Sequence, residues 1–193
     1  KPVKISTLVS VGKDKNLLVV SGLGILIQLL TFATVFGFTP IVAETIGASK
    51  FELGLLSTLS TLPVIFASAM SGSIFAKRFG EKKTLINSFL ITSFSCIVIP
   101  FINDLTLLYL SQIIGGFGRG LVMSLLMGLS IKSVEPDRRA TAMGFFQAIY
   151  GIGMSIGPVL VGFLSDTVGL NWGFWTTGGL GIVGALLSHL LIK

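Results

Sequence analysis

One arginine stands alone in a long uncharged stretch of this chain. Arg119 lies between Leu105 and Ile131, and this segment contains no other charged side chain. The segment is long enough to cross a bilayer, which takes about 20 apolar residues. A charge near the middle of the hydrocarbon costs at least about 2.5–3.5 kcal/mol, so such residues normally face a bundle interior or a wet cavity. The sequence therefore predicts a membrane helix that lines a polar path, with Arg119 attracting an anionic or carbonyl group.

Polar side chains recur at helical spacing on three of the apolar segments. Gln112, Gly116 and Met123 share a face with Arg119, because residues three to four positions apart are neighbours on a helix. Two further segments each carry a polar stripe of the same kind. The candidate substrate-binding residues are Arg119, Gln28, Gln147, Tyr150, Gln112 and Thr31. Two interpretations stay open: the stripes line a solute cavity, or they hold the helices together by hydrogen bonds worth about 0.6 kcal/mol each.

The composition places the chain in a membrane. Only 11% of its residues are charged and 52% are hydrophobic, whereas soluble domains carry about 25% charged residues. The net charge of +6 does not indicate nucleic acid, because the basic residues lie between apolar segments and form no stripe beside exposed aromatic residues. We therefore expect the lipid bilayer as a partner, and no nucleic acid.

Two strings that resemble catalytic motifs fit helix packing better than chemistry. Residues 153–157 match G-x-S-x-G, but a nucleophile elbow requires a strand before its helix. Residues 179–184 match G-x-G-x-x-G, again with no preceding strand. No Asp, Glu or His lies at mid-depth in an apolar run, and the one histidine, His189, is close to the C-terminus. The sequence predicts no enzyme activity, no metal site and no cofactor.

The apolar runs predict one bundle of six membrane-spanning helices. A capping box at Ser49 and Glu52 starts the second, and Pro136 precedes the fifth, where a first helical turn tolerates proline. Pro40 disfavours helix at the residue before it, so we expect the first span to end near residue 38. Residues 1–15 predict a cytoplasmic amphipathic lead-in to the bundle at 16–193. The predicted spans cover about 16–38, 50–76, 83–99, 105–131, 137–164 and 172–192.

The basic residues alternate between the predicted loops. Twelve of the fourteen lie in the two termini, in the loop after the second span and in the loop after the fourth, and the other two are Lys50 and Arg119. Loops rich in Lys and Arg stay in the cytoplasm. The count predicts a multi-pass protein of a bacterial-type inner (plasma) membrane, with both termini cytoplasmic.

The loop after the second span resembles a family signature. Residues 73–83, SIFAKRFGEKK, are similar to the Gly-x-Leu-Ala-Asp-Arg-x-Gly-Arg-Lys loop of the major facilitator superfamily. Arg78 and Gly80 match this loop, whereas Lys77 replaces the aspartate and Glu81 replaces the arginine. The double reversal predicts an ion pair kept with opposite polarity, the alternative being a solvated run of charges. The resemblance implies that this loop latches the cytoplasmic side.

A second resemblance lies in the fifth span. Residues 153–162, GMSIGPVLVG, are similar to the family's antiporter motif Gly-x-x-x-Gly-Pro-x-x-Gly-Gly. Gly153, Gly157, Pro158 and Gly162 match the motif, and Val161 departs from it. The resemblance implies that this stretch shapes and bends the helix.

The resemblance covers the whole chain and implies an all-α membrane protein, six transmembrane helices forming half of a twelve-helix major facilitator fold. In that family the first and fourth helices of each half line the cavity, and transport proceeds by rocking one half against the other. The basic start and the missing signature aspartate favour the C-terminal half. Because the chain begins at Lys1 rather than at a methionine, we expect a piece of a longer protein.

The sequence is compatible with two functions. The first is half of a secondary active transporter that moves a small organic solute by alternating access, as an antiporter or exporter. Its implied partners are the small-molecule solute and either the other six-helix half or a second copy. The second function is a six-helix membrane scaffold or partner-binding subunit without transport activity. A cavity that reaches Arg119 would favour the transporter.

Overall fold

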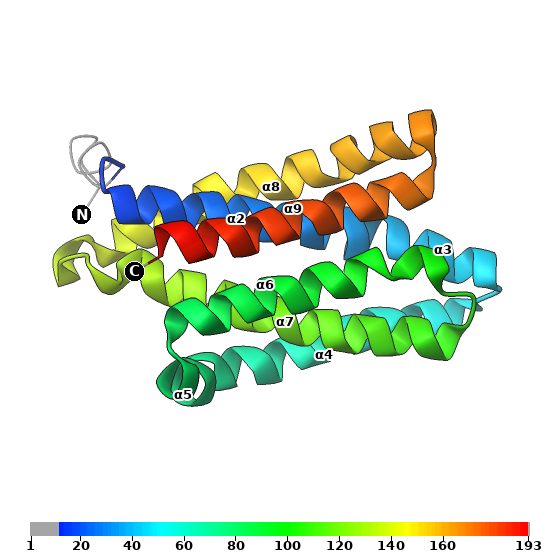
Figure 1. Ribbon diagram of the computed structural model, residues 1–193, viewed down its shortest axis with the longest axis horizontal. Helices are drawn as coiled ribbons and strands as arrows, with labels where there is room; N and C mark the ends of the chain where they lie inside the picture. Colours follow the sequence, from blue (N-terminus) through cyan, green and yellow to red (C-terminus); the bar gives the residue numbers. More distant parts are fainter. Residues whose placement is uncertain (1–11, 193) are drawn as a thin grey trace.

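The structure is an all-α bundle, which confirms the predicted fold class (Figure 1). The computed structural model describes residues 12–192, and this part contains no strand. Six of its helical stretches are long and apolar enough to cross a membrane. They cover Lys15–Ile46, Lys50–Phe79, Glu81–Phe101, Leu105–Lys132, Pro136–Val168 and Leu170–Leu191. Most of the predicted amphipathic lead-in at residues 1–15 lies outside the described residues.

The first span continues beyond Pro40, so its predicted end near residue 38 is wrong. It consists of α2 (Lys15–Ala33), the π-helical segment η1 (Thr34–Phe38) and α3 (Thr39–Ile46). Pro40 lies in the first turn of α3, where its missing N–H is tolerated, and the wider π turn before it leaves room for the proline ring. The span ends at Gly47, whose left-handed φ of 101° caps the helix.

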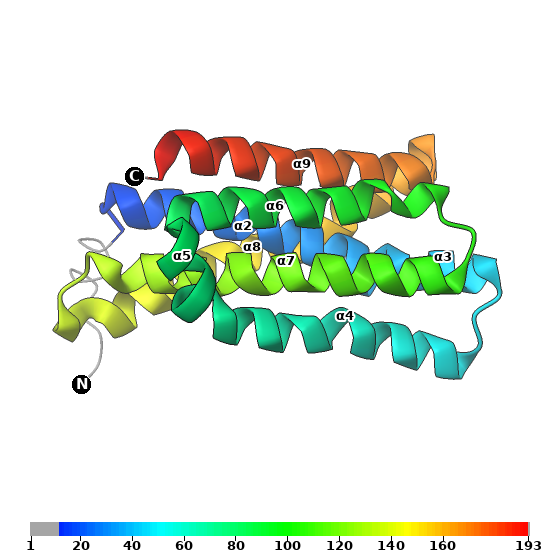
Figure 2. The same ribbon diagram turned by 60° about the horizontal axis from the view of Figure 1, so that its bottom comes forward.

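The second span also contains a π-helical segment. Its main part, α4 (Lys50–Met70), begins with the predicted capping box, in which the Ser49 hydroxyl accepts a hydrogen bond from the Glu52 N–H and the Glu52 carboxylate accepts one from the Ser49 N–H. The π-helical segment η2 (Ser71–Ala76) follows, and α5 (Lys77–Phe79) completes the span. The wide turn of η2 displaces the end of this span from the line of α4 (Figure 2).

The remaining four spans are mostly regular α-helix, with short 3-10 turns at two of their ends. They are α6 (Glu81–Ile97) with the 3-10 turn η3 (Ile99–Phe101), α7 (Leu105–Lys132), the 3-10 turn η4 (Pro136–Arg138) leading into α8 (Arg139–Val168), and α9 (Leu170–Leu191). Gly169 alone separates α8 from α9, with φ 99°, where the sequence predicts a loop from 165 to 171. Among the polar residues at the end of α8, the Thr167 hydroxyl donates to the Phe163 carbonyl of the same helix at 2.8 Å.

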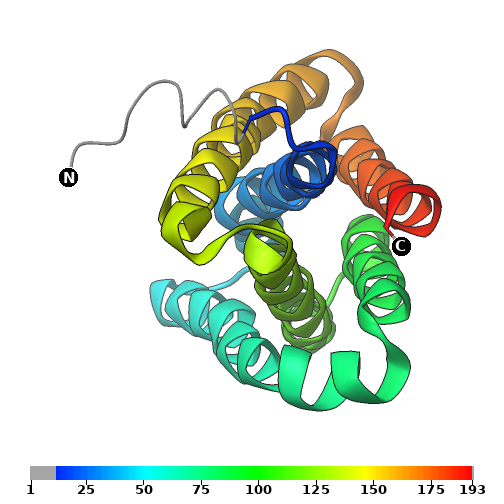
Figure 3. The ribbon, with the colours of Figure 1, turned by 90° about the vertical axis from the view of Figure 1, so that its left-hand side faces the viewer.

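Two central helices organise the bundle. α2 and α7 lie in the middle, α8 packs along α2, α4 packs along α7, and α6 and α9 lie together on the opposite side (Figure 3). In the most apolar stretch of the first and fourth spans, 56% and 61% of residues are buried, against only 17% in the second and in the fifth. The central helices are therefore covered by protein, whereas α4 and α8 present most of their apolar surface outward.

Glycines on α7 bring its neighbours close. A Cβ added at Gly120 would lie 2.5 Å from the Val64 carbonyl oxygen of α4, and one added at Gly118 would lie 2.9 Å from the Ser88 carbonyl oxygen of α6. Membrane helices commonly associate through small residues that let their backbones approach closely, because the hydrophobic effect does not favour helix association in lipid.

The two ends of the bundle differ in chemistry. The start of α2, α5, the end of α7 and the start of α8 lie at one end, here called the basic end (Figure 1). Its basic residues include Lys15, Lys77, Lys132 and Arg139. The opposite end carries an aromatic cluster, in which the Trp175 ring centroid lies 5.3 Å from that of Trp172 and 6.0 Å from that of Phe101. Aromatic rings of this kind favour the level of the lipid headgroups.

Candidate functional site

A small cavity lies beside Arg119, between α2, α4 and α7. It has a volume of about 190 Å³. Its lining residues are Ile27, Gln28, Thr31, Val35, Phe36, Ser60, Thr61, Val64, Arg119 and Met123. The lining is mainly apolar, and Arg119 is the one charged residue among the described residues that form it. The cavity is formed by both central helices, at the depth where the sequence predicts a polar path.

Arg119 is buried, with 6% of its surface exposed. Its Nη2 donates a hydrogen bond of 3.1 Å to the Ser60 carbonyl oxygen on α4. A Cβ added at Gly115 or Gly116 would lie 3.2 Å from Nη1 or 3.4 Å from Nη2, so the guanidinium lies beside these two glycines of α7. Its position one turn toward the start of α7 follows from the tilt of helical side chains.

No carboxylate neutralises Arg119 within residues 12–192. The ion pairs there join Lys132 to Glu81 and Arg138 to Glu135, both near the basic end. A guanidinium has five N–H donors, and one bond to a backbone carbonyl leaves most of them available. Because a buried charge is costly without a partner, Arg119 is suited to receive an anionic or carbonyl oxygen from outside this part of the chain.

Gln28 and Thr31 of α2 reach the same cavity. Both side chains are partly buried and belong to its lining. The Thr31 hydroxyl donates to the Ile27 carbonyl at 2.7 Å, which leaves its oxygen lone pairs free to accept a further hydrogen bond. The structure thus brings together three of the six predicted solute-binding residues, one from α7 and two from α2.

Gln112 does not line the cavity. Its side chain is 2% exposed, its amide nitrogen donates to the Ser111 hydroxyl at 3.4 Å, and its amide oxygen is buried without a hydrogen-bond partner among the described residues. Gln112 shares a helical face with Arg119, but it lies two turns away and packs inside the bundle.

The two candidates on α8 also lie outside the cavity. Gln147 is exposed, and Tyr150 is half-buried, with its ring 5.1 Å from that of Phe146 in an edge-to-face arrangement. Their helix packs on α2 and leaves most of its surface uncovered, and neither side chain lines the Arg119 cavity. The sequence does not point to Ser60, because its contribution is a backbone oxygen.

The signature-like loop at the basic end does not contain the predicted pair between Lys77 and Glu81. The Glu81 carboxylate binds Lys132 Nζ at 2.7 Å, and within the described residues Lys77 has no ion pair. Gly80 separates the two residues with φ 83° and ψ 151°, a conformation almost restricted to glycine, and this turn directs Glu81 toward the end of α7. Arg78 lies over the Phe79 ring, 5.3 Å from its centroid.

The antiporter-like stretch of α8 packs tightly on α2. A Cβ at Gly153 would overlap the Ile25 carbonyl oxygen, and one at Gly157 would lie 2.7 Å from the Leu29 carbonyl oxygen. Pro158 lies inside α8, and Gly162 lies beside the Phe38 ring, 4.0 Å from the position of an added Cβ. The glycines therefore serve as the contact surface between α8 and a cavity-lining helix.

A model of the Major Facilitator Superfamily matches residues 21–193. The chain belongs to the major facilitator superfamily. This is a family of membrane transporters and not of enzymes, and it accounts for the six apolar helices of a multi-pass membrane protein. The resemblance seen in the two sequence motifs is thereby confirmed at the level of the family.

This major facilitator chain is also similar to drug-resistance proteins. It is 29% identical over 176 residues to the quinolone resistance protein NorA of Staphylococcus aureus (strain MRSA252), covering 91% of the chain and 42% of that relative. It is 23% identical over 184 residues to Multidrug resistance protein 2 of Bacillus subtilis (strain 168), covering 95% of the chain and 46% of that relative. The chain spans less than half the length of these relatives, which agrees with one half of a twelve-helix fold.

Proposed function

We propose that the chain is one six-helix half of a secondary active transporter that exports small organic solutes by alternating access. Membership of the major facilitator superfamily supports the transporter type, and similarity to proteins named for quinolone and multidrug resistance supports export. The charge distribution supports a plasma membrane location with both termini cytoplasmic, and the basic start of the chain supports the C-terminal half.

One observation carries the proposed solute site: a buried arginine without a carboxylate partner in residues 12–192 faces a cavity between the two central helices. Gln28 and Thr31 supply further hydrogen bonds there. The cavity of about 190 Å³ is smaller than the roughly 300–1,000 Å³ of a drug-sized site. The remaining volume comes from a second set of six helices, either the other half or a second copy, packed on the exposed faces of α4 and α8. Gln147 and Tyr150 of α8 would then contribute from the side of that interface.

The two motif regions have structural roles in this proposal. The close contact of Gly153 and Gly157 with α2 lets α8 move as one body with a cavity-lining helix. The loop from 73 to 83 latches the basic end through the Glu81–Lys132 ion pair. Rocking of the two halves then opens the Arg119 cavity to either side of the membrane in turn.

The test measures quinolone accumulation, by quinolone fluorescence, in bacterial cells that express the complete transporter containing this chain. Arg119→Ala should abolish export while membrane expression is retained, and Arg138→Ala serves as a matched control because Arg138 lies in η4 outside the cavity. Full export by Arg119→Ala would refute the site. In that case Arg119 is a structural link between α7 and the Ser60 carbonyl, as in the scaffold interpretation.

A further inference from the structure

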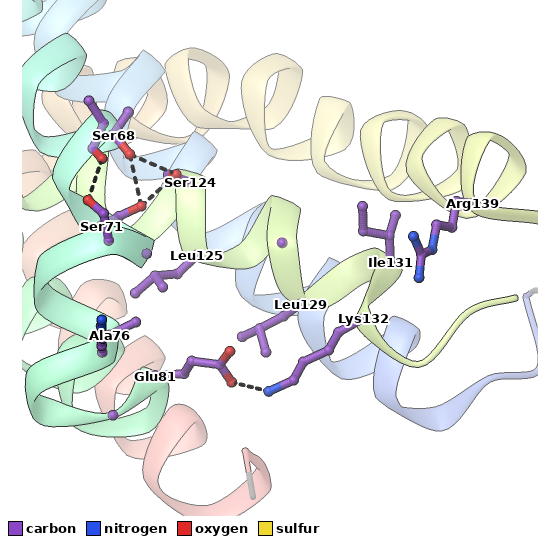
Figure 4. Close-up of a pocket in the computed structure, with 16 residues that line it drawn as sticks. Ser68, Ser71, Ala76, Glu81, Ser124, Leu125, Leu129, Ile131, Lys132 and Arg139 are labelled. Atoms are coloured by element: carbon purple, nitrogen blue, oxygen red, sulfur yellow. Dashed lines mark hydrogen bonds and ion pairs between the residues drawn. The ribbon is translucent and has the colours of Figure 1, made fainter. Parts of the chain in front are cut away.

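A second and larger pocket lies at the basic end, away from the Arg119 cavity. It has a volume of about 960 Å³ and lies between η2, α5, the last turns of α7 and the start of α8 (Figure 4). We call it the basic-end pocket. None of its lining residues is shared with the Arg119 cavity. The two pockets can therefore bind different ligands.

The pocket exists because the helix widens into a π turn at η2 and because several of the residues that line the pocket are small. The π-helical η2 carries Gly72, and α7 carries Gly128, and a Cβ added at either position would meet nothing within 4 Å. The floor is a serine cluster that joins η2 to α7. The Ser71 hydroxyl donates to the Ser124 hydroxyl at 2.7 Å, and the Ser124 hydroxyl donates to the Ser68 carbonyl at 3.2 Å (Figure 4). The hollow is thus fixed by hydrogen bonds and is not a gap between loose helices.

The rim of the pocket carries more positive than negative charge. Lys77, Lys132 and Arg139 line it, and within residues 12–192 Glu81 is its one acidic lining residue. Glu81 is paired with Lys132 across the pocket at 2.7 Å (Figure 4). Arg139 donates through Nε to the Val134 carbonyl at 3.2 Å, and neither Arg139 nor Lys77 forms an ion pair with a described residue. Lys77 and Arg139 therefore have no counter-charge among the described residues, and both side chains are exposed.

The pocket extends from the headgroup level into the hydrocarbon. α7 has 28 residues and is about 42 Å long, which exceeds the roughly 30 Å of hydrocarbon, so its last residue Lys132 lies at the membrane surface. Ser124 lies about 12 Å deeper, at 1.5 Å per residue. Leu125 and Leu129 form an apolar wall between them. A ligand that fits this gradient has an anionic head and an apolar body.

We propose that the basic-end pocket binds an anionic phospholipid, with its phosphate at the rim to which Lys77 and Arg139 give a net positive charge and its chains against the apolar wall. A free phosphate ion would satisfy the two cations but would leave the apolar wall without an occupant. Ile74 and Phe79, which follow Ser73 and precede Gly80 of the pocket lining in the chain, are 46% and 50% exposed. The pocket is lined by both η2 and α7, so the lipid would hold the two together.

The test measures thermal unfolding of the detergent-solubilised protein with added phosphatidylglycerol, phosphatidylcholine or inorganic phosphate. The double variant Lys77→Gln/Arg139→Gln removes the proposed counter-charges. The matched control is Lys83→Gln/Arg138→Gln, which removes the same charge from the same end at residues that do not line the pocket. Both variants must melt like the wild type without lipid, and native mass spectrometry counts the bound lipid independently.

Phosphatidylglycerol should stabilise the wild type and the control, and phosphatidylcholine and inorganic phosphate should not. In the pocket variant the apparent affinity for phosphatidylglycerol should fall by about 5-fold for each cation removed, since a basic residue near an anionic leaflet contributes a factor of about that size. Equal losses in the pocket variant and the control would show general surface attraction and overturn the site. Stabilisation by inorganic phosphate alone would overturn the lipid as its occupant.

Discussion

Replacing Gly157 by alanine should force α8 away from α2. The added Cβ would lie 2.7 Å from the Leu29 carbonyl oxygen and 3.2 Å from the Leu29 Cα, whereas ordinary contact begins at 3.4 Å. The helices must separate by about 0.7 Å at this point, the difference between 3.4 and 2.7 Å, because both atoms belong to the backbone and cannot rotate away. Overpacking of this kind costs about 1–3 kcal/mol, and alanine regains about 0.8–1.0 kcal/mol through its helix propensity.

Gly151 of the same helix provides the matched control. A Cβ at Gly151 would meet nothing within 4 Å, so Gly151→Ala gains the same helix propensity without the clash. The free energies of unfolding of the two variants should therefore differ by about 1–3 kcal/mol, with Gly157→Ala the less stable. For a chain of this length the difference corresponds to about 2–12 °C in Tm, at roughly 2–4 °C for each kcal/mol.

The assay is thermal unfolding in detergent, followed by circular dichroism of the helices. Both variants should retain the helical spectrum of the wild type at low temperature, because the clash affects packing and not helix formation. Equal Tm values for Gly157→Ala and Gly151→Ala would refute the close contact of α8 with α2, and with it the role given to the antiporter-like stretch.

The remaining predictions concern single positions. Gly80→Ala should lower Tm, because its φ of 83° and ψ of 151° cost another residue about 1–3 kcal/mol, whereas Gly72→Ala should not; equal melting of the two would contradict the strained turn. Ser49→Ala should cost about 0.5–2 kcal/mol in thermal unfolding through loss of the α4 cap, and an unchanged Tm would contradict that cap. Gln112→Leu removes a buried amide oxygen that has no hydrogen-bond partner among the described residues, so Tm should be unchanged or higher. Quinolone export should continue, and a loss of export would show that Gln112 belongs to the solute site.

The number and type of the spans follow from the sequence because a bilayer imposes a fixed length. Six apolar runs, separated by charged residues, leave little choice of arrangement. The boundary at Pro40 was not predictable from the proline rule, because that rule assumes a regular α-helix before the proline. The π turn at η1 changes the backbone there, and only Gly47, with its left-handed φ, ends the span.

The site is harder to predict than the spans. Helical spacing gives the face that a residue occupies on its own helix, but not the neighbour that this face meets. Arg119 and Gln28 line one cavity because α7 and α2 are both central, whereas Gln147 has the same kind of spacing on an outer helix and remains exposed. The Ser60 contact uses a backbone oxygen, which every residue has, and so leaves no signal in the residue types.

The aromatic cluster gives the protein a built-in optical reporter. The chain has two tryptophans, Trp172 and Trp175, and they form one pair beside Phe101 at the end of the bundle remote from Lys132. Indole emission therefore arises from a single corner of the molecule. A water-soluble quencher that is confined to one side of a sealed vesicle dims this emission only when that corner faces it. The orientation of the bundle across the lipid can thus be determined on the native sequence, without an introduced label.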